Sequence, residues 1–167
     1  MSRYAVLVLV LMFLSRGAQA QTPIQYNNKL VAITDSLHQK GTRWVRVFKE
    51  VKMIKEFTAL TPYRKDLEQY INGKISELKA DKDVSGSGEL KQAVLEFLDY
   101  EKNFVTSAFE PVEQLGETAS DEDIKAAIVN INTESQKEGP VLARVNAAQE
   151  AYARKNNFNM AAPADKQ

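Results

Sequence analysis

The sequence contains no cysteine and only one histidine among its 167 residues. Without cysteine the chain can form no disulfide bond, can hold no thiolate nucleophile and cannot be a lipoprotein anchored through a lipidated cysteine. The C-x-x-C-H motif that attaches a c-type haem is absent for the same reason. The fold must therefore be stabilised by packing and not by covalent cross-links.

The single histidine leaves few routes to catalysis or metal binding. His38 follows Leu37, which lies on the apolar face of a predicted helix, so we expect the imidazole to point away from the core. A Ser–His–Asp triad would then have no base. Asp35 and His38 fall short of the two Glu-x-x-His pairs that a di-metal site in a helical bundle requires. The sequence predicts no catalytic residue, no metal ligand and no cofactor, so we do not expect an enzyme.

Long apolar runs are missing except near the N-terminus. Residues 5–14 form an apolar run of ten, Arg3 precedes it, and residues 18–20 (AQA) match the pattern read by signal peptidase. Ten residues are too few to cross a bilayer, which takes about 20. We interpret residues 1–20 as a signal peptide that exports the protein to the periplasm or out of the cell, leaving no transmembrane span. A retained N-terminal anchor is the alternative.

An excess of one charge is also missing. The whole chain has 22 basic and 22 acidic residues, and leaving out Arg3 and Arg16 of the signal peptide gives 20 basic residues against 22 acidic ones, a net charge of −2. This balance argues against nucleic acid or an acidic membrane surface as the main partner.

What the sequence does contain is apolar residues at helical spacing. Residues 26–57 carry a stripe that recurs every three or four residues over about eight turns. It consists of Tyr26, Leu30, Ile33, Leu37, Lys40, Trp44, Val47, Val51 and Ile54. One helix cannot bury such a stripe alone, so the rest of the chain has to cover it.

Two further helices follow this first one. Thr61 and Pro62 are a suitable N-cap and first helical residue, and the second helix should end before Asp81. The third helix should span residues 89–115 and bend or loosen at Pro111.

The fourth helix should begin at the N-cap Ser120 and run to about residue 156, with a kink or break at Gly139-Pro140. No segment resembles a strand. We predict an all-α fold, an antiparallel up-down-up-down four-helix bundle over residues 21–158 with long first and last helices. Residues 159–167 should form a flexible C-terminal tail.

The unequal helix lengths predict an exposed end. The first and last helices should project past the other two, so the segments Tyr26 to Leu37 and Leu142 to Tyr152 would meet there with little cover. Exposed apolar surface of this kind could bind a protein partner or a second copy. The alternative is that the break at Gly139-Pro140, or side-chain bulk, closes this end.

Three charged residues occupy stripe positions where apolar residues are expected, namely Lys40, Glu101 and Glu138. Helix counting places them within about two turns of one another, beside Gly41 and Gly139. They form either a partly exposed ion pair at the bundle flank or a polar pocket that binds a small ligand.

The loop at residues 81–89 partly matches a calcium-binding EF-hand. Its matching residues are Asp81, Asp83, Ser85, Gly86, Ser87 and Glu89. The twelfth position, however, is Gln92 in place of a bidentate glutamate. The alternative is a flexible loop, because the same residue types favour turns.

Three segments resemble a known family. They are residues 26–31 (YNNKLV), 90–104 (LKQAVLEFLDYEKNF) and 147–158 (AAQEAYARKNNF). The chain resembles a family of small exported bacterial surface proteins of unknown function, found in Bacteroidota and in Leptospira. The resemblance implies a helical bundle at the cell envelope and supplies no activity or catalytic residues.

Two functional hypotheses follow from these patterns. The first is a non-catalytic binding or interaction module in the bacterial cell envelope. The alternative is a carrier for a small ligand or, weakly, for calcium, using the layer of Lys40, Glu101 and Glu138 or the loop at residues 81–89.

Overall fold

The computed structural model describes residues 21–160, so the predicted signal peptide and the last seven residues lie outside it. All regular structure within these residues is helical, which confirms the predicted all-α class. The elements are α2 (Pro23–Val51), the 3-10 helix η1 (Phe57–Leu60), α3 (Thr61–Ala80), α4 (Gly88–Phe104), the π-helix η2 (Val105–Phe109), α5 (Glu110–Glu113), α6 (Asp121–Ser135) and α7 (Glu138–Lys155).

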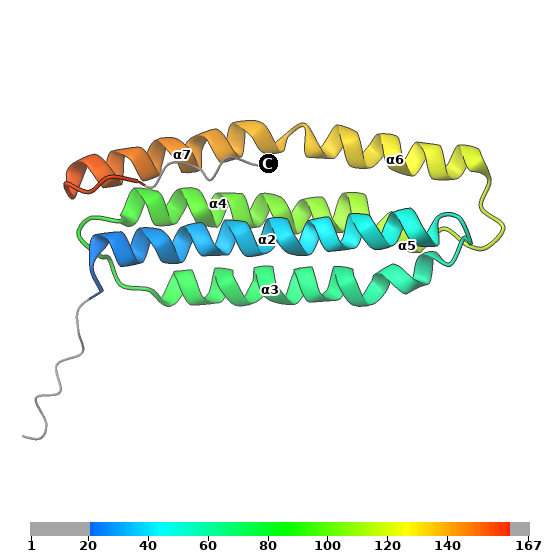
Figure 1. Cartoon of the computed structure of the whole chain (residues 1–167), viewed down its shortest axis with the longest axis horizontal. Helices are drawn as coiled ribbons and strands as arrows, with labels where there is room; N and C mark the ends of the chain where they lie inside the picture. Colours follow the sequence, from blue (N-terminus) through cyan, green and yellow to red (C-terminus); the bar gives the residue numbers. More distant parts are fainter. Residues whose placement is uncertain (1–20, 161–167) are drawn as a thin grey trace, which may run out of the picture.

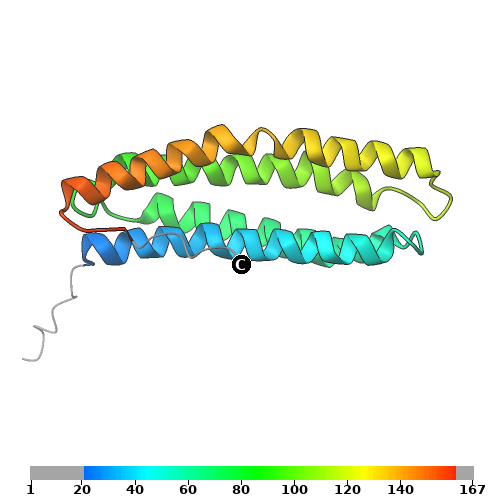
Figure 2. The same cartoon turned by 45° about the horizontal axis from the view of Figure 1, so that its top comes forward.

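These elements form four rods along the long axis of the molecule (Figure 1). The first rod is α2, the second joins η1 and α3, the third joins α4, η2 and α5, and the fourth joins α6 and α7. α3 contacts both α2 and α4, and α7 contacts mainly α4. Figure 2 shows the result as two layers, α2 with α3 and α4 with the α6–α7 rod.

α2 begins as the sequence indicates but ends earlier. Thr22 caps it in a capping box with Gln25. The helix stops at Val51, and Lys55 takes a left-handed φ of 58° that turns the chain back toward Phe57, which is buried. The prediction that the packed stripe reaches Ile54 is therefore wrong, and this side chain is 63% exposed.

Thr61 does not act as the predicted N-cap. η1 runs directly into α3, so Thr61 has helical dihedral angles, φ −51° and ψ −44°. Its hydroxyl instead donates to a carboxylate oxygen of Glu113 at 2.9 Å. Arg64 Nε donates to the same carboxylate at 2.8 Å, and this buried cluster fastens α3 to α5. The predicted end of this helix before Asp81 is confirmed.

The third rod loosens just before Pro111. The backbone N–H of Glu110 donates to the carbonyl of Val105, five residues back, in the π-helical turn η2. Proline has no N–H to donate four residues back, to Ser107. The side-chain amide of Asn130 in α6 donates to that carbonyl at 2.9 Å and ties the fourth rod to the third.

The predicted start and interruption of the fourth rod are both confirmed. Ser120 caps α6 in a reciprocal capping box with Asp123. α6 ends at Ser135 and α7 begins at Glu138, so the break falls just before Gly139-Pro140. Tyr100 Oη donates to the carbonyl of Glu134 at 2.7 Å and fixes α4 to this break.

The end predicted to be exposed is closed. Tyr26, Leu30, Ile33, Val145 and Tyr152 are all buried there. α3 reaches this end, and the loop after it covers the two outer rods, because Tyr152 Oη donates to the carbonyl of Val84 at 2.8 Å. Lys29 adds ion pairs to Asp81 at 2.7 Å and Glu77 at 2.9 Å. The expectation of an apolar binding surface on these residues is wrong.

Candidate functional site

A groove of about 650 Å³ lies between α2 and the fourth rod, with α4 and η2 beneath it. The two rods that border the groove meet at the closed end of the molecule. There the rings of Tyr26 and Tyr152 pack edge to face, with their centroids 6.5 Å apart. Further along, α3 and α4 remain packed while α2 and the fourth rod leave space between them. The opening is therefore at the middle of the molecule and not at its end.

The floor of the groove is aromatic and is shaped by the π-helical turn. Phe97, Tyr100, Phe104 and Phe109 line it. In an α-helix, residues five apart lie about 140° apart around the axis. The extra residue of η2 brings Phe104 and Phe109 together, with ring centroids 5.0 Å apart and an interplanar angle of 68°. Phe109 also stacks on the buried Trp44, with ring centroids 3.8 Å apart, so the floor of the groove packs directly against the hydrophobic core.

The α2 wall combines empty space with basic groups. Gly41 lines the groove, and a Cβ atom placed there would meet nothing within 4 Å. His38 is exposed and faces away from the core, as the sequence predicts, and it lines the groove together with Val45. Arg46 and Lys49 line its far part, three turns along α2 from Asp35.

The opposite wall carries two carboxyl groups. The structure brings Glu101 of α4 and Glu138 of α7 to this groove, and within residues 21–160 neither makes an ion pair. Burial, followed by the charge of Glu138, raises the pKa of Glu101 to about 8. Burial and the neighbouring charges of Glu101, Glu138 and Glu134 raise the pKa of the Tyr100 hydroxyl to about 12. Glu101 is therefore largely protonated at neutral pH.

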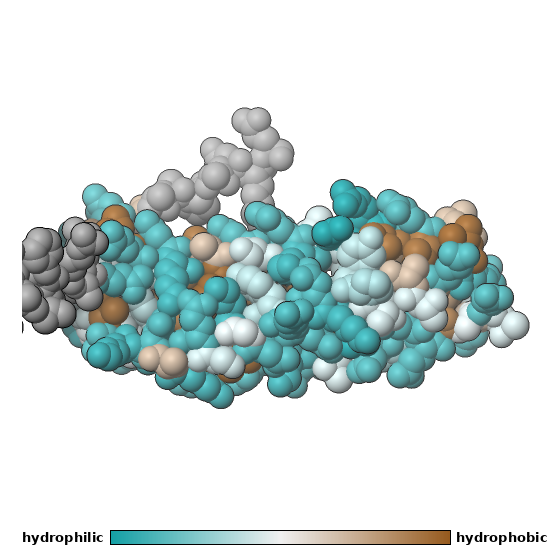
Figure 3. Space-filling view, turned by 90° about the horizontal axis from the view of Figure 1, so that it is seen from below, coloured by the Kyte–Doolittle hydropathy of each residue, from teal (hydrophilic) through white to brown (hydrophobic). Residues whose placement is uncertain are grey.

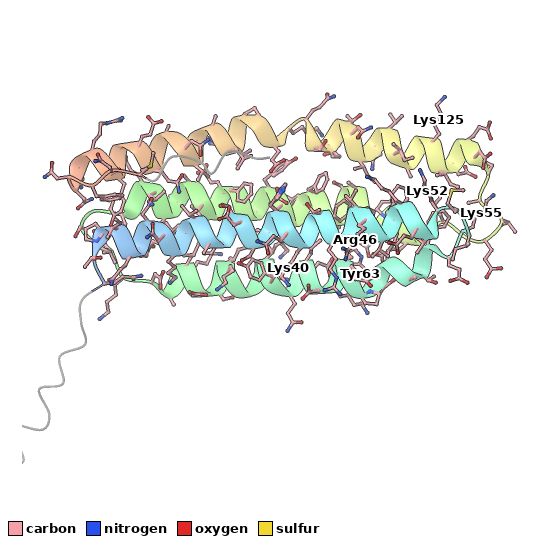
Figure 4. The ribbon with its side chains drawn as sticks, in the orientation of Figure 1. Lys40, Arg46, Lys52, Lys55, Tyr63 and Lys125 are labelled. Carbon is pink, nitrogen blue, oxygen red and sulfur yellow. The ribbon has the colours of Figure 1, made fainter. Side chains whose placement is uncertain are left out.

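Lys40 is not part of this site, which corrects the predicted layer of three charges. Its Nζ lies 2.6 Å from Oδ2 of Asp66 and 5.4 Å from the ring centroid of Tyr70, so it belongs to the contact between α2 and α3. At 3.6 residues per turn, Lys40 lies about 160° around α2 from His38. Six residues apart, Lys40 and the groove residue Arg46, both labelled in Figure 4, lie about 120° apart around the same helix.

The loop at residues 81–89 is a self-contained turn and not an open ligand cradle. The side chain of Asp83 accepts hydrogen bonds from Ser87 Oγ at 3.0 Å and Gly86 N at 3.2 Å, and these bonds lower its pKa, the one from Ser87 most. Asp81 is paired with Lys29. In the part of the chain that the structure describes, no three His, Cys, Asp or Glu side chains are grouped to hold a metal ion. The geometry therefore does not favour the calcium alternative.

Sequence reasoning missed the aromatic floor. None of Phe97, Tyr100, Phe104 and Phe109 was expected to line a site. One available signal was the spacing of Phe97, Tyr100 and Phe104 beside Glu101. Another was Pro111, whose missing N–H permits the π turn that moves Phe109.

Comparisons with protein-family models, curated proteins and solved structures give no match for this chain. The resemblance to exported bacterial surface proteins therefore stays a prediction. Within residues 21–160, no helix is both long and apolar enough to cross a bilayer.

Proposed function

We propose that the protein is an exported, non-catalytic binding protein of the bacterial cell envelope that holds a small amphipathic molecule in the groove. In this proposal the four rods form an antiparallel up-down-up-down bundle, opened on one side between its first and last members. The observation that carries the proposal is the groove itself. Its volume of about 650 Å³ lies within the range of about 300–1,000 Å³ typical of small-molecule sites.

The lining of the groove supports binding of an amphipathic molecule. Aromatic and aliphatic side chains form most of the floor, while the polar groups stand at the walls. This combination is common in ligand sites, where apolar surface supplies affinity and a few polar groups fix orientation. Among the hydrogen bonds of residues 21–160, none joins His38 to a serine or carboxylate that could form a nucleophile–base pair, which favours binding over catalysis.

Fluorescence of the single tryptophan tests this function. Trp44 stacks on the groove residue Phe109, so a fluorescent ligand in the groove should accept its excitation energy. We expect one molecule of the uncharged dye N-phenyl-1-naphthylamine to bind per chain. Gly41→Leu should fill the groove and weaken binding at least ten-fold.

Gly73→Leu is the matched control, because Gly73 is also a helical glycine with nothing within 4 Å of its Cβ position, yet lies in α3 away from the groove. Its binding should equal that of the unmodified chain. Equal loss in both variants, or no loss in either, would contradict binding in the groove.

A second candidate function is association through an exposed apolar turn. Met53 and Ile54, directly after α2, are 78% and 63% exposed. Figure 3 shows apolar surface gathered at this end of the molecule. If this turn joins two copies, sedimentation should show a concentration-dependent dimer that the double variant Met53→Ser and Ile54→Ser abolishes. A strict monomer at high concentration would exclude self-association.

A further inference from the structure

Three basic residues of the elements around the groove are paired with carboxylates outside it. Lys40 pairs with Asp66 at 2.6 Å, and Lys137 pairs with Glu134 at 2.6 Å. Arg144 pairs with Glu96 at 2.9 Å on the outer side of α4 and α7. Glu101 and Glu138 are left facing the groove without a cation from these neighbours.

The basic groups of the groove lie at its other end. Arg46 and Lys49 follow His38 by eight and eleven residues, which places them about 12–16 Å further along α2. Glu138 is the charged neighbour that, after burial, raises the pKa of Glu101. The end of the groove at Glu101 and Glu138 is therefore acidic, and Asp35 lines the α2 wall of the same groove.

The surroundings of these carboxyl groups suit a cation larger than a metal ion. No group of three ligating side chains in residues 21–160 is close enough together to hold a metal. Aromatic rings line the groove together with the carboxyl groups. The rings of Tyr100 and Phe104 are stacked, with their centroids 6.3 Å apart. Aromatic faces attract ammonium groups and also bury apolar carbon.

We propose that the groove binds an organic ammonium ion with an apolar body. Its cationic group lies between Glu101 and Glu138, and its body lies on the aromatic floor at Tyr100 and Phe104. This proposal rests on the proposed function of the groove as a small-molecule site and adds the chemical class of the ligand.

Binding of a cation is linked to release of a proton. Glu138 of α7 is the charged neighbour of Glu101, Asp35 and His38 of α2 line the same groove, and Glu134 of α6 is a charged neighbour of the adjacent Tyr100. Because the pKa of Glu101 is about 8, a cation that favours the carboxylate form should bind about ten-fold more tightly at pH 9 than at pH 7. Titration calorimetry in buffers of different ionisation enthalpy should show the released proton.

The experiment uses three probes that differ only in their end group, 4-phenylbutylammonium, 4-phenylbutanoate and 4-phenylbutanol. At pH 8 we expect the ammonium ion to bind at least ten-fold more tightly than the other two. Glu101→Gln should weaken this preference several-fold, because only Glu138 remains beside the cation, and should remove the dependence on pH.

Asp99→Asn serves as the control. Asp99 is an exposed carboxylate of the same helix, two residues before Glu101 and therefore on a different face. Asp99→Asn should leave the affinities for all three probes unchanged. Far-ultraviolet circular dichroism should show that both variants are folded.

The outcomes separate the ligand class from the function. If 4-phenylbutanol or 4-phenylbutanoate binds as tightly as the ammonium ion, or if Glu101→Gln leaves the preference undiminished, the ligand class is wrong while the groove remains a binding site. If no probe binds but the naphthylamine dye does, only the ligand class fails. If neither the probes nor the dye binds, both proposals fail.

Discussion

At the scale of single residues, Glu101 shows how a surface groove changes the chemistry of a carboxyl group. Its pKa of about 8 results from burial first and from the charge of Glu138 second. The unfolded chain loses this proton near its ordinary value of 4.5. Between these two pH values the folded state holds one more proton than the unfolded state, so the free energy of unfolding falls as pH rises.

Replacing Glu101 with glutamine should remove this dependence. We expect the free energy of unfolding of Glu101→Gln to equal that of the unmodified chain at pH 4 and to be about 1–3 kcal/mol higher at pH 9. This difference is smaller than the full pKa shift implies, because water in the groove screens the charge. Urea denaturation at a series of pH values measures the difference. A constant difference between the two curves from pH 4 to pH 9 would contradict the assignment.

Trp44 is the central side chain of the core. It is fully buried and stacks on Phe48 at 5.5 Å and Phe109 at 3.8 Å. Trp44→Ala should lower the free energy of unfolding by about 3–5 kcal/mol, because it leaves a large cavity. The adjacent Val45 lies on the groove wall, partly exposed, and Val45→Ala should cost under about 1 kcal/mol. Denaturation followed by circular dichroism compares the two variants.

Single residues also mark where sequence patterns mislead. Lys40 fits the spacing of the stripe in residues 26–57, yet it lies at the edge of the buried face and pairs with Asp66 in α3. A stripe read from spacing identifies the buried face of a helix but not which neighbour each position meets. Glu101 and Glu138 meet in the groove because the fourth rod packs on α4, and the sequence pattern gives the height of each residue but not this pairing.

At the scale of helices, caps and prolines were predictable while helix ends set by tertiary contacts were not. Ser120 caps α6 through its own side chain, so its signal is local. Thr61 is likewise a hydroxyl residue that favours N-caps, but its hydroxyl donates to Glu113 of a distant element. The early end of α2 depends likewise on Phe57 returning to the core.

Substitutions of glycines test how backbone conformation contributes to the stability of the helices and of the loop after α3. Gly41 in α2 and Gly73 in α3 have open space at the Cβ position. Gly41→Ala and Gly73→Ala should each stabilise the protein by about 0.5–1 kcal/mol, because alanine restricts the unfolded chain and favours the helix. Gly86→Ala should destabilise it, since Gly86 has a φ of +77°, a backbone conformation that residues with a Cβ atom rarely adopt. Thermal denaturation of the three variants measures these shifts.

At the scale of the whole molecule, helix lengths predicted an opening at the wrong end, whereas the predicted layer containing Glu101 and Glu138 lies at the true opening. Helix lengths alone suggested that the end holding Tyr26 and Tyr152 lacks cover. The loop after α3 supplies that cover, and its contribution cannot be counted from helix lengths. The true opening depends on how far two rods separate along their length, which is a property of packing and not of periodicity.

The closed end should be independent of the groove. Tyr152→Phe removes the hydrogen bond to Val84 and should lower the free energy of unfolding by about 1 kcal/mol. The affinity for N-phenyl-1-naphthylamine should stay unchanged, because Tyr152 does not line the groove. Denaturation and dye titration of the same sample test both statements. A large loss of affinity would show that the closed end controls the groove.

The π-helical turn lets the groove floor tolerate a change in the number of codons in the gene. A π turn holds one residue more than the α-helical turn it replaces. Deleting the exposed Thr106 would let the third rod continue as an α-helix, in which Phe104 and Phe109 would be four residues apart and would still lie on one face. A gene that lost this one codon would still encode the four helical rods and the aromatic pair. One residue could therefore be gained or lost in this turn while Phe104 and Phe109 stay together.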